Sequence, residues 1–218
     1  MIRLIIYFSC TILTVLFFKQ IDETLINWNF SWTLSKTTPY LLLIILGSLI
    51  AYEIVKKVKN SKKFIKIILC FLITPSPFLI GFAINPIYEG DYSKDGDVLK
   101  NEMKNNDFNE NGLSVLSIPG CHFCSESIEK LKKIKKRNPK LSITFIVLSR
   151  DLRALTKYKK EINGVFKLKL ASNPDNFAVL AQLKFPAFLI IKNKKPIYRW
   201  SNDQFGVRAI DLLEAIKK

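Results

Sequence analysis

Three long apolar segments near the amino terminus constrain the fold of this chain most strongly. Each contains a single charged residue, and they cover residues 2–18, 39–55 and 64–87. A helix needs about 20 apolar residues to cross a bilayer core about 30 Å thick. We therefore predict that residues 1–88 form a membrane unit with three transmembrane helices. The first segment is too long for the apolar part of a signal peptide and no small-residue cleavage site follows it, so we expect it to stay attached.

The charges of the loops predict the orientation of these helices. The loop between the second and third segments and its flanks are rich in lysine: Lys56, Lys57, Lys59, Lys62, Lys63 and Lys66. The loop before it carries two lysines and two acidic residues. Short cytoplasmic loops collect lysine and arginine. We therefore expect the amino terminus inside the cytoplasm and everything after Asn85 outside it.

The remainder of the chain reads as a linker and one α/β domain. Residues 89–111 are polar, and we expect a linker with a short helix around Leu99 and Met103. Periodicity over residues 112–218 predicts the order β-α-β-α-β-α-β-β-α. The predicted strands are 113–118, 141–148, 165–170, 186–192 and 196–200, and the helices are 125–137, 152–161, 173–183 and 205–218. The first half requires parallel crossovers, and the second half ends in a hairpin.

A C-x-x-C sequence, Cys121-His122-Phe123-Cys124, lies between the first predicted strand and the first long helix of this domain. Such a pair serves either zinc ligation or dithiol redox chemistry. A structural zinc site usually has four ligands. The other cysteines, Cys10 and Cys70, fall inside predicted membrane helices, and His122 is the only histidine. We therefore expect no metal site and favour a redox-active dithiol.

The position of the pair suggests how such a dithiol works. At a helix amino terminus, unpaired backbone N–H groups and the helix dipole favour a thiolate. Cys121 is then the nucleophile, and Cys124, one turn along, resolves the mixed disulfide. His122, followed by Phe123, is expected to modulate the pair, because a positive imidazole lowers the pKa of a neighbouring thiol.

Phe185 and Pro186 stand immediately before a predicted strand, about 60 residues beyond the cysteine pair. X-Pro bonds adopt the cis form far more readily than other peptide bonds. A cis proline here exposes the backbone of Phe185, which can then bind a substrate peptide by strand-like hydrogen bonds. The alternative is a trans proline at the start of an edge strand.

Taken together, Pro119-Gly120-Cys121-His122-Phe123-Cys124 and Phe185-Pro186-Ala187 in this element order resemble the thioredoxin fold. Residues 112–218 are similar to the membrane-anchored thioredoxin-like proteins of bacterial envelopes. The resemblance implies a cis Pro186 and a domain held outside the bacterial inner membrane. Thioredoxins proper carry a buried Asp six residues before the first cysteine, whereas Val115 stands there.

The function implied is that of a membrane-tethered thiol–disulfide oxidoreductase. Its partners would be cysteine-containing envelope or secreted proteins, a membrane or envelope redox partner, and the lipid bilayer. We expect no cofactor beyond the Cys121–Cys124 pair. The alternative is a thioredoxin-fold binding module or Cu(I) metallochaperone without redox turnover, since soft thiolates select Cu(I).

Two further features were weighed. Cys10 and Cys70 lie at similar membrane depths, so they are either a dithiol that relays electrons outward or apolar filler, the more common use of buried cysteine. The chain has 34 basic and 18 acidic residues, a net charge of +16. Nucleic-acid binding is one reading of this excess. We expect no nucleic acid, because the basic helix 125–137 lacks interleaved aromatic residues and lies outside the cytoplasm.

Overall fold

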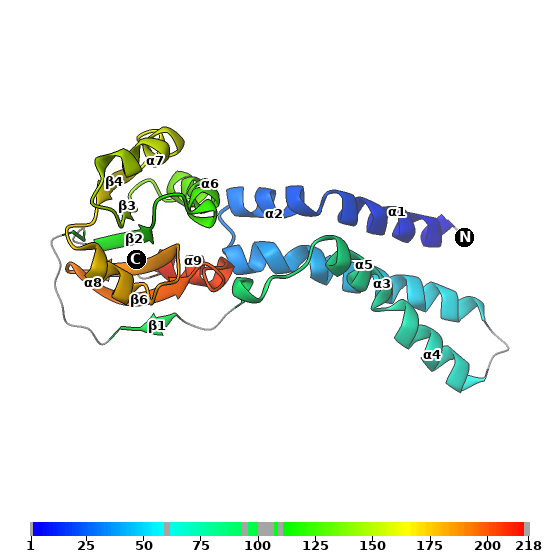
Figure 1. Ribbon diagram of the computed structural model, residues 1–218. Helices are drawn as coiled ribbons and strands as arrows, with labels where there is room; N and C mark the ends of the chain where they lie inside the picture. Colours follow the sequence, from blue (N-terminus) through cyan, green and yellow to red (C-terminus); the bar gives the residue numbers. More distant parts are fainter. Residues whose placement is uncertain (1, 59–61, 93–95, 100–106, 109–110, 216–218) are drawn as a thin grey trace. The chain divides into compact units, whose positions relative to one another are not determined.

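The computed structural model describes residues 2–58, 62–92, 96–99, 107–108 and 111–215 (Figure 1). The chain divides into two compact units, residues 1–88 and 89–218, which are described one at a time. Met103 and the last three residues of the predicted final helix lie outside the described residues.

In the first unit the described residues form five helices joined by turns. Its helices are α1 (Ile2–Leu16), α2 (Phe18–Asn27), α3 (Trp32–Lys57), α4 (Lys63–Ile73) and α5 (Ser76–Ile84) (Figure 1). Two helices are long and apolar enough to cross a membrane, namely α3 and the 63–84 stretch of α4 with α5. The pair α1 and α2, bent by 71°, is a third candidate span. Up to three apolar spans thus precede the α/β part, as predicted.

The boundaries of two spans differ from the prediction. The first helix ends at Leu16, and Phe18 already begins α2, which occupies part of the expected loop. The second helix begins at Trp32 because Ser31 caps it, accepting a 3.1 Å hydrogen bond from the Leu34 N–H. The apolar pattern missed this polar first turn, which is helical because its cap satisfies a free backbone donor.

The break between α4 and α5 follows from Pro77. In a continuous helix the N–H of residue 77 would bond to the Ile73 carbonyl, but proline has no N–H. The Ser76 hydroxyl donates to the Ile73 oxygen instead, at 2.8 Å. Inside a bilayer no water can satisfy such a carbonyl. The Ser76 hydroxyl therefore supplies a substitute donor from within the same segment.

Small residues and aromatic rings hold these helices together. A side chain at Gly47 on α3 would collide with the Thr74 carbonyl, and one at Gly81 on α5 would collide with Leu43. Tyr40 packs edge-on against Phe18 and Phe78, with ring centroids 4.7 and 5.8 Å away. Small residues at helix contacts let backbones approach closely in membranes.

One ion pair and one ring contact fix the relative directions of α1 and α3. Arg3 near the start of α1 lies 3.9 Å from Glu53 near the end of α3. Just beyond the other end of α1, Phe18, the first residue of α2, packs against Tyr40 in the first half of α3. The two helices therefore run antiparallel.

The second unit is built on a six-stranded mixed sheet. Its strands are β1 (Asp97–Val98), β2 (Asn111–Ser117), β3 (Ile143–Val147), β4 (Lys167–Leu170), β5 (Ala187–Lys192) and β6 (Lys195–Ser201), and their spatial order is β1-β6-β5-β2-β3-β4. Strands β2, β3 and β4 are parallel, while β5 and β6 form an antiparallel hairpin. The predicted parallel first half and closing hairpin are confirmed.

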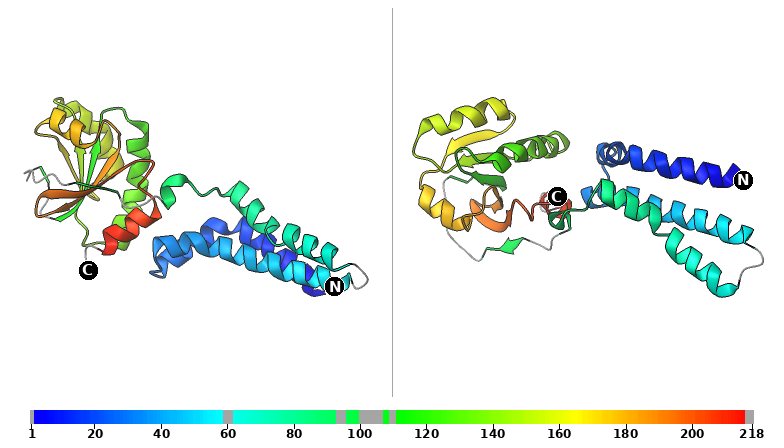
Figure 2. Two further views of the ribbon diagram at one scale, coloured as in Figure 1. Left: turned by 90° about the horizontal axis from the view of Figure 1, so that it is seen from below. Right: turned by 45° about the vertical axis from the view of Figure 1, so that its right-hand side comes forward.

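Helices cover both faces of this sheet (Figure 2). They are α6 (His122–Arg137), α7 (Leu155–Ile162) after the short 3₁₀ turn η2 (Leu152–Ala154), α8 (Pro174–Leu180) and α9 (Val207–Ala215). Successive strand residues point to opposite faces. Phe145 packs against Tyr158 of α7, whereas the next residue, Ile146, packs in the cluster that contains Phe177 of α8. This explains why all of β3 is buried.

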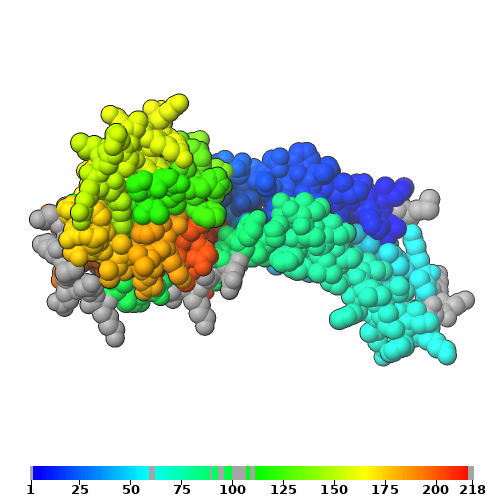
Figure 3. Space-filling model, viewed as in Figure 1, coloured from blue at the N-terminus to red at the C-terminus, as the bar shows by residue number. Residues whose placement is uncertain are grey.

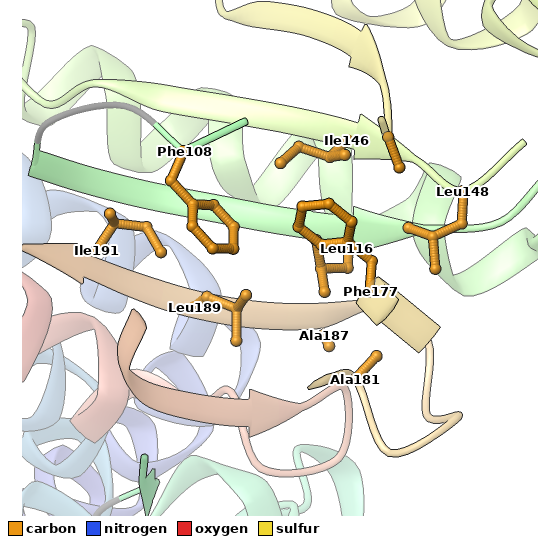
Figure 4. Packing of buried hydrophobic residues seen from close by; sticks show 10 residues of the cluster. Phe108, Leu116, Ile146, Leu148, Phe177, Ala181, Ala187, Leu189 and Ile191 are labelled. Atoms are coloured by element: carbon orange, nitrogen blue, oxygen red, sulfur yellow. The ribbon is translucent and has the colours of Figure 1, made fainter. Parts of the chain in front are cut away.

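The core on the α8 face is made of aliphatic side chains from three central strands and two aromatic rings (Figure 4). Leu116, Ile146 and Leu189 come from β2, β3 and β5. The rings of Phe108 and Phe177 meet edge-on, with centroids 5.4 Å apart. On the other face α6 and α7 lie side by side (Figure 3).

The expected linker over residues 89–111 needs correction, because its described parts belong to the second unit. A 3₁₀ turn, η1 (Glu89–Asp91), opens this unit, and β1 pairs with β6 at the sheet edge. Leu99 is extended, not helical, and its N–H donates to the Ile197 carbonyl at 3.1 Å. Phe108 is only 3% exposed. Strand pairing at a sheet edge is made by backbone groups, so it can occur in a polar sequence that has no strand-like apolar pattern.

Candidate functional site

A tight turn carries the chain from β2 into α6. Pro119 occupies its second position, and Gly120, with φ +72°, occupies its third, which is the pattern of a type II turn. The Cys121 N–H donates to the Ile118 carbonyl across the turn at 3.4 Å. Only a residue without a Cβ adopts this φ freely. Glycine at position 120 therefore suits the left-handed third position of this turn.

The turn places Cys121 at the N-cap of α6. Its sulfur accepts a hydrogen bond from the Cys124 N–H at 3.1 Å, as a serine or aspartate does at other helix starts. Cys121 and Cys124 form a disulfide, with Cα atoms 5.3 Å apart. Cys121 is half-buried, whereas Cys124 is fully buried. An incoming sulfur therefore reaches Cys121 first.

The two residues between the cysteines point outward. Phe123 is 57% exposed. The Nε2 of His122 lies 3.1 Å from an oxygen of Glu126, one helical turn along, and both side chains are exposed. A protonated imidazole would therefore face a carboxylate, which offsets its charge. The modulating role of His122 and Phe123 stays a prediction.

Phe185 and Pro186 lie at the same end of the sheet as the cysteines. In the antiparallel pair of β2 and β5, Leu116 is opposite Ala187, so Pro186 lies beside the end of β2. The Phe185–Pro186 peptide bond is cis. The Phe185 side chain is half-buried and packs against the α8-face core. Its backbone, not its ring, is therefore the candidate substrate contact.

Sequence analysis missed one residue at this site. Tyr158 of α7 is 1% exposed, and its hydroxyl donates to the Ile118 carbonyl at 2.7 Å. Burial raises the pKa of the Tyr158 phenol, and the charge of Glu161 raises it further, while the Ser117 side chain and the Cys121 backbone N–H lower it. The phenol oxygen thus lies close to the strand end and turn that precede the cysteines. The only sequence signal was a tyrosine on the apolar side of a short helix.

The other two cysteines belong to the first unit. Cys10 and Cys70 are free thiols on α1 and α4. Across the described residues, no three His, Cys, Asp or Glu side chains gather as metal ligands would.

No protein-family model matches this chain, and no curated protein matches it. Among solved structures it is similar to a secreted disulfide oxidoreductase of Mycobacterium tuberculosis, at 15% identity and a TM-score of 0.39, over 49% of this chain and 81% of that one. It is also similar to the thioredoxin domain of a Bacteroides vulgatus thiol-disulfide oxidoreductase, at 19% identity and a TM-score of 0.39, over 55% of this chain and 91% of that one. A thiol:disulfide interchange protein from a Bacteroides species gives 20% identity and a TM-score of 0.38, over 56% of this chain and 82% of that one.

The sheet itself identifies the fold. A central parallel strand leads into a C-x-x-C helix, and an antiparallel hairpin pairs on its other side. The second unit of this chain therefore has the thioredoxin-like fold of thiol–disulfide oxidoreductases and carries its disulfide between Cys121 and Cys124.

Proposed function

We propose that this protein is a membrane-tethered thiol–disulfide oxidoreductase that acts outside the cytoplasm. One observation carries the proposal: the sulfur of Cys121, accessible and bridged to the buried Cys124, accepts a backbone N–H at the start of α6. Once the bridge is reduced, the same N–H stabilises a thiolate on Cys121. An accessible thiolate beside a buried partner is the arrangement that disulfide exchange requires.

The exchange is a two-electron transfer between disulfides. The Cys121 thiolate attacks one sulfur of a substrate disulfide, forming a mixed disulfide and releasing the other substrate sulfur as a thiolate. Cys124 loses its proton and attacks the Cys121 sulfur, which releases the second substrate thiolate and closes the Cys121–Cys124 bridge. The substrate is reduced by two electrons and the protein is oxidised. Run in reverse, the same steps oxidise a substrate dithiol.

The location follows from the membrane unit. The lysine-rich loop lies at the end of α3, the end at which Glu53 meets Arg3 of α1. By the charge rule this end faces the cytoplasm, and the end of α5 at Asn85 faces outward. Residues 89–218 then lie in a compartment where disulfides persist, outside the cytoplasmic membrane of a bacterium. The substrates are cysteine-containing envelope or secreted proteins, and a membrane or envelope redox partner resets the pair.

Mixed-disulfide trapping tests the chemistry. In the Cys124→Ala variant of the full chain in detergent micelles, Cys121 can attack a substrate but nothing resolves the adduct. We expect a dithiothreitol-reversible adduct with a disulfide-containing protein such as insulin, and none in the Cys121→Ser/Cys124→Ala control. Absence of the adduct from both variants would contradict the proposal and favour a binding module.

A redox titration of the wild-type pair against glutathione or dithiothreitol buffers gives the direction. A midpoint near about −270 mV is that of a reductant, and one near about −120 mV is that of an oxidant. Failure of the pair to form a disulfide at any poise would rule out both.

Reporter fusions test the location. Alkaline phosphatase joined after Tyr88 replaces the second unit and is expected to be active, because it folds only outside the cytoplasm. The matched fusion after Lys57 ends in the lysine-rich loop and is expected to be inactive. The reverse pattern would place the cysteines in the cytoplasm.

A further inference from the structure

The carbonyl of Ile118 is the central acceptor of the active-site turn. It accepts the Cys121 N–H at 3.4 Å, which closes the turn, and the Tyr158 hydroxyl at 2.7 Å. The first distance is long for an N–H···O bond and the second is ordinary for O–H···O. The shorter bond to Tyr158 is therefore the main fixed point of this turn.

Tyr158 is itself held firmly. It projects from α7 into the layer between that helix and the sheet, where it is 1% exposed. Its ring lies against Phe145 of β3, with centroids 5.0 Å apart. The phenol therefore has a defined position set by the core, and it transmits that position to a surface turn 40 residues earlier in the chain.

We propose that Tyr158 is a positioning residue for Cys121: its phenol holds the Ile118–Cys121 turn in the form that presents the Cys121 sulfur to the Cys124 N–H. This inference rests on the proposed function, because it takes Cys121 as the attacking sulfur. Tyr158 acts through the turn and not on the substrate.

The surroundings of the phenol fit this role. Burial keeps Tyr158 protonated, since it raises the pKa of the phenol, so the hydroxyl stays a donor throughout the neutral range. The groups facing the phenol oxygen are the Ile118 carbonyl, the buried Ser117 side chain of β2 and the Cys121 N–H, with the Glu161 charge on its own helix. Three of these four belong to the segment that ends at the nucleophile.

The outer side of the turn is open at Gly120. Apart from its two chain neighbours, none of the described residues has an atom within 4 Å of where a Cβ at Gly120 would lie. The turn is therefore held from its core side, by the hydrogen bond between the Tyr158 hydroxyl and the Ile118 carbonyl. Loss of the phenol leaves this carbonyl with only the longer hydrogen bond described above, and Cys121 is then free to move away from the Cys124 N–H.

The test measures the pKa of the reduced Cys121 thiol from the pH dependence of its alkylation, in the full chain carrying Cys10→Ala and Cys70→Ala. Tyr158→Phe keeps the ring and removes the hydroxyl. We expect it to raise the pKa of Cys121 enough to slow alkylation at pH 6 about threefold, the effect of about half a hydrogen bond to a thiolate. Placing 4-aminophenylalanine at position 158 restores an N–H donor and should restore the rate.

Two controls separate positioning from stability. Tyr198→Phe makes the same chemical change on β6, where the ring stacks on Trp200 at 5.7 Å, and should leave the rate unchanged. Phe177→Leu loosens the core cluster that does not include Tyr158, so its folded fraction should alkylate at nearly the wild-type rate. An equal slowing in Phe177→Leu and Tyr158→Phe would overturn the inference, as would a folded Tyr158→Phe protein with an unchanged pKa of Cys121.

If Tyr158→Phe fails to fold, Gly120→Ala tests the same route from the open side of the turn. An alanine cannot adopt φ +72° without strain, so the turn loosens while the core stays intact. The pKa of Cys121 should rise here too, and an unchanged value would refute a route through the turn. The alkylation measurements do not require catalytic turnover. If the wild-type pair catalysed no disulfide exchange, the proposed function would be contradicted. If the wild-type protein catalysed exchange but Tyr158→Phe left the pKa of Cys121 unchanged, only this inference would be contradicted.

Discussion

The two units of this chain use apolar side chains in opposite ways. On the helices of the first unit, which include the candidate membrane spans, large apolar side chains point outward, as for Phe71 at 79% exposed, while the helix contacts rely on Gly47 and Gly81. In the thioredoxin-like unit the large side chains are inside, as for Phe145 at 0% exposed. Lipid attracts apolar side chains as well as a protein core does, so helix association there depends on close approach. In water, burial itself stabilises the fold.

The cysteines show the same division. Cys121 and Cys124 are bonded and placed by a turn, a helix start and a buried tyrosine. Cys10 and Cys70 are free thiols on separate helices. A reactive dithiol needs a built environment, and the second unit provides one for Cys121 and Cys124.

Replacing Cys121 by serine should abolish disulfide exchange. A serine hydroxyl is not a nucleophile toward sulfur at neutral pH, so insulin reduction by dithiothreitol should fall to the uncatalysed rate. The matched Cys10→Ala/Cys70→Ala protein should keep the wild-type rate. If the double alanine variant also lost activity in micelles, Cys10 or Cys70 would take part in the exchange, and the contrast between the two units would be wrong.

Truncating Phe177 to alanine should destabilise the second unit by about 3–5 kcal/mol, the usual cost of an emptied aromatic site. Phe177 is 1% exposed and faces Phe108 across the core. Urea unfolding followed by tryptophan fluorescence measures the loss. Val179→Ala, on the exposed side of the same helix, should change the free energy of unfolding little. Equal losses in both variants would show that burial does not govern this unit.

A methyl group at Gly47 should weaken the membrane unit by about 1–3 kcal/mol, the usual cost of overpacking. It would meet the Thr74 carbonyl, which is backbone and cannot rotate away. Thermal unfolding of Gly47→Ala in micelles checks this, with the outward-facing Ile45→Leu as control. The redox midpoint of Cys121–Cys124 should stay the same in both, and a shifted midpoint would show that the two units are coupled.

The smallest effect is on the pH dependence of stability. Tyr158 has its pKa raised by burial, whereas in the unfolded chain a phenol titrates near the ordinary value of 10.0. Below pH 10 both states are protonated and Tyr158 contributes no slope. Above it the unfolded state loses the proton first, so the free energy of unfolding falls until pH passes the folded pKa. Tyr158→Phe should make this decline shallower, and parallel curves would contradict the pKa shift.

The spacing of apolar residues, together with the Gly, Pro and Asn residues that end helices and strands, predicted most of the second unit. The apolar side of α6, with Ile128, Leu131 and Ile134, repeats every three or four residues, and all three are buried. The cysteine pair could be recognised from the sequence because two cysteines separated by two residues are a motif of redox dithiols and metal sites. By contrast, β1 joins the sheet through backbone pairing with β6, and α2 interrupts an expected loop. Pairing of that kind is made by main-chain atoms and leaves little trace in composition.

The hydrogen bond of Tyr158 could not be predicted from the sequence for a different reason. Its hydroxyl meets a carbonyl 40 residues away, and that meeting depends on how α7 packs over β3. Local patterns place a tyrosine on the apolar side of a helix but do not say which carbonyl its hydroxyl finds. The same holds for the Ser76 hydroxyl, whose acceptor becomes evident only once Pro77 interrupts the helix.

The place of β2 in the sheet has a consequence for the order of synthesis. This strand lies between β3 and β5, and β5 comes late in the chain. A growing polypeptide therefore presents Cys121 and Cys124 well before the strand that completes the sheet beside them has been made. Through that interval β2 has no partner on its β5 side, so the two cysteines follow the end of a strand whose sheet is still incomplete.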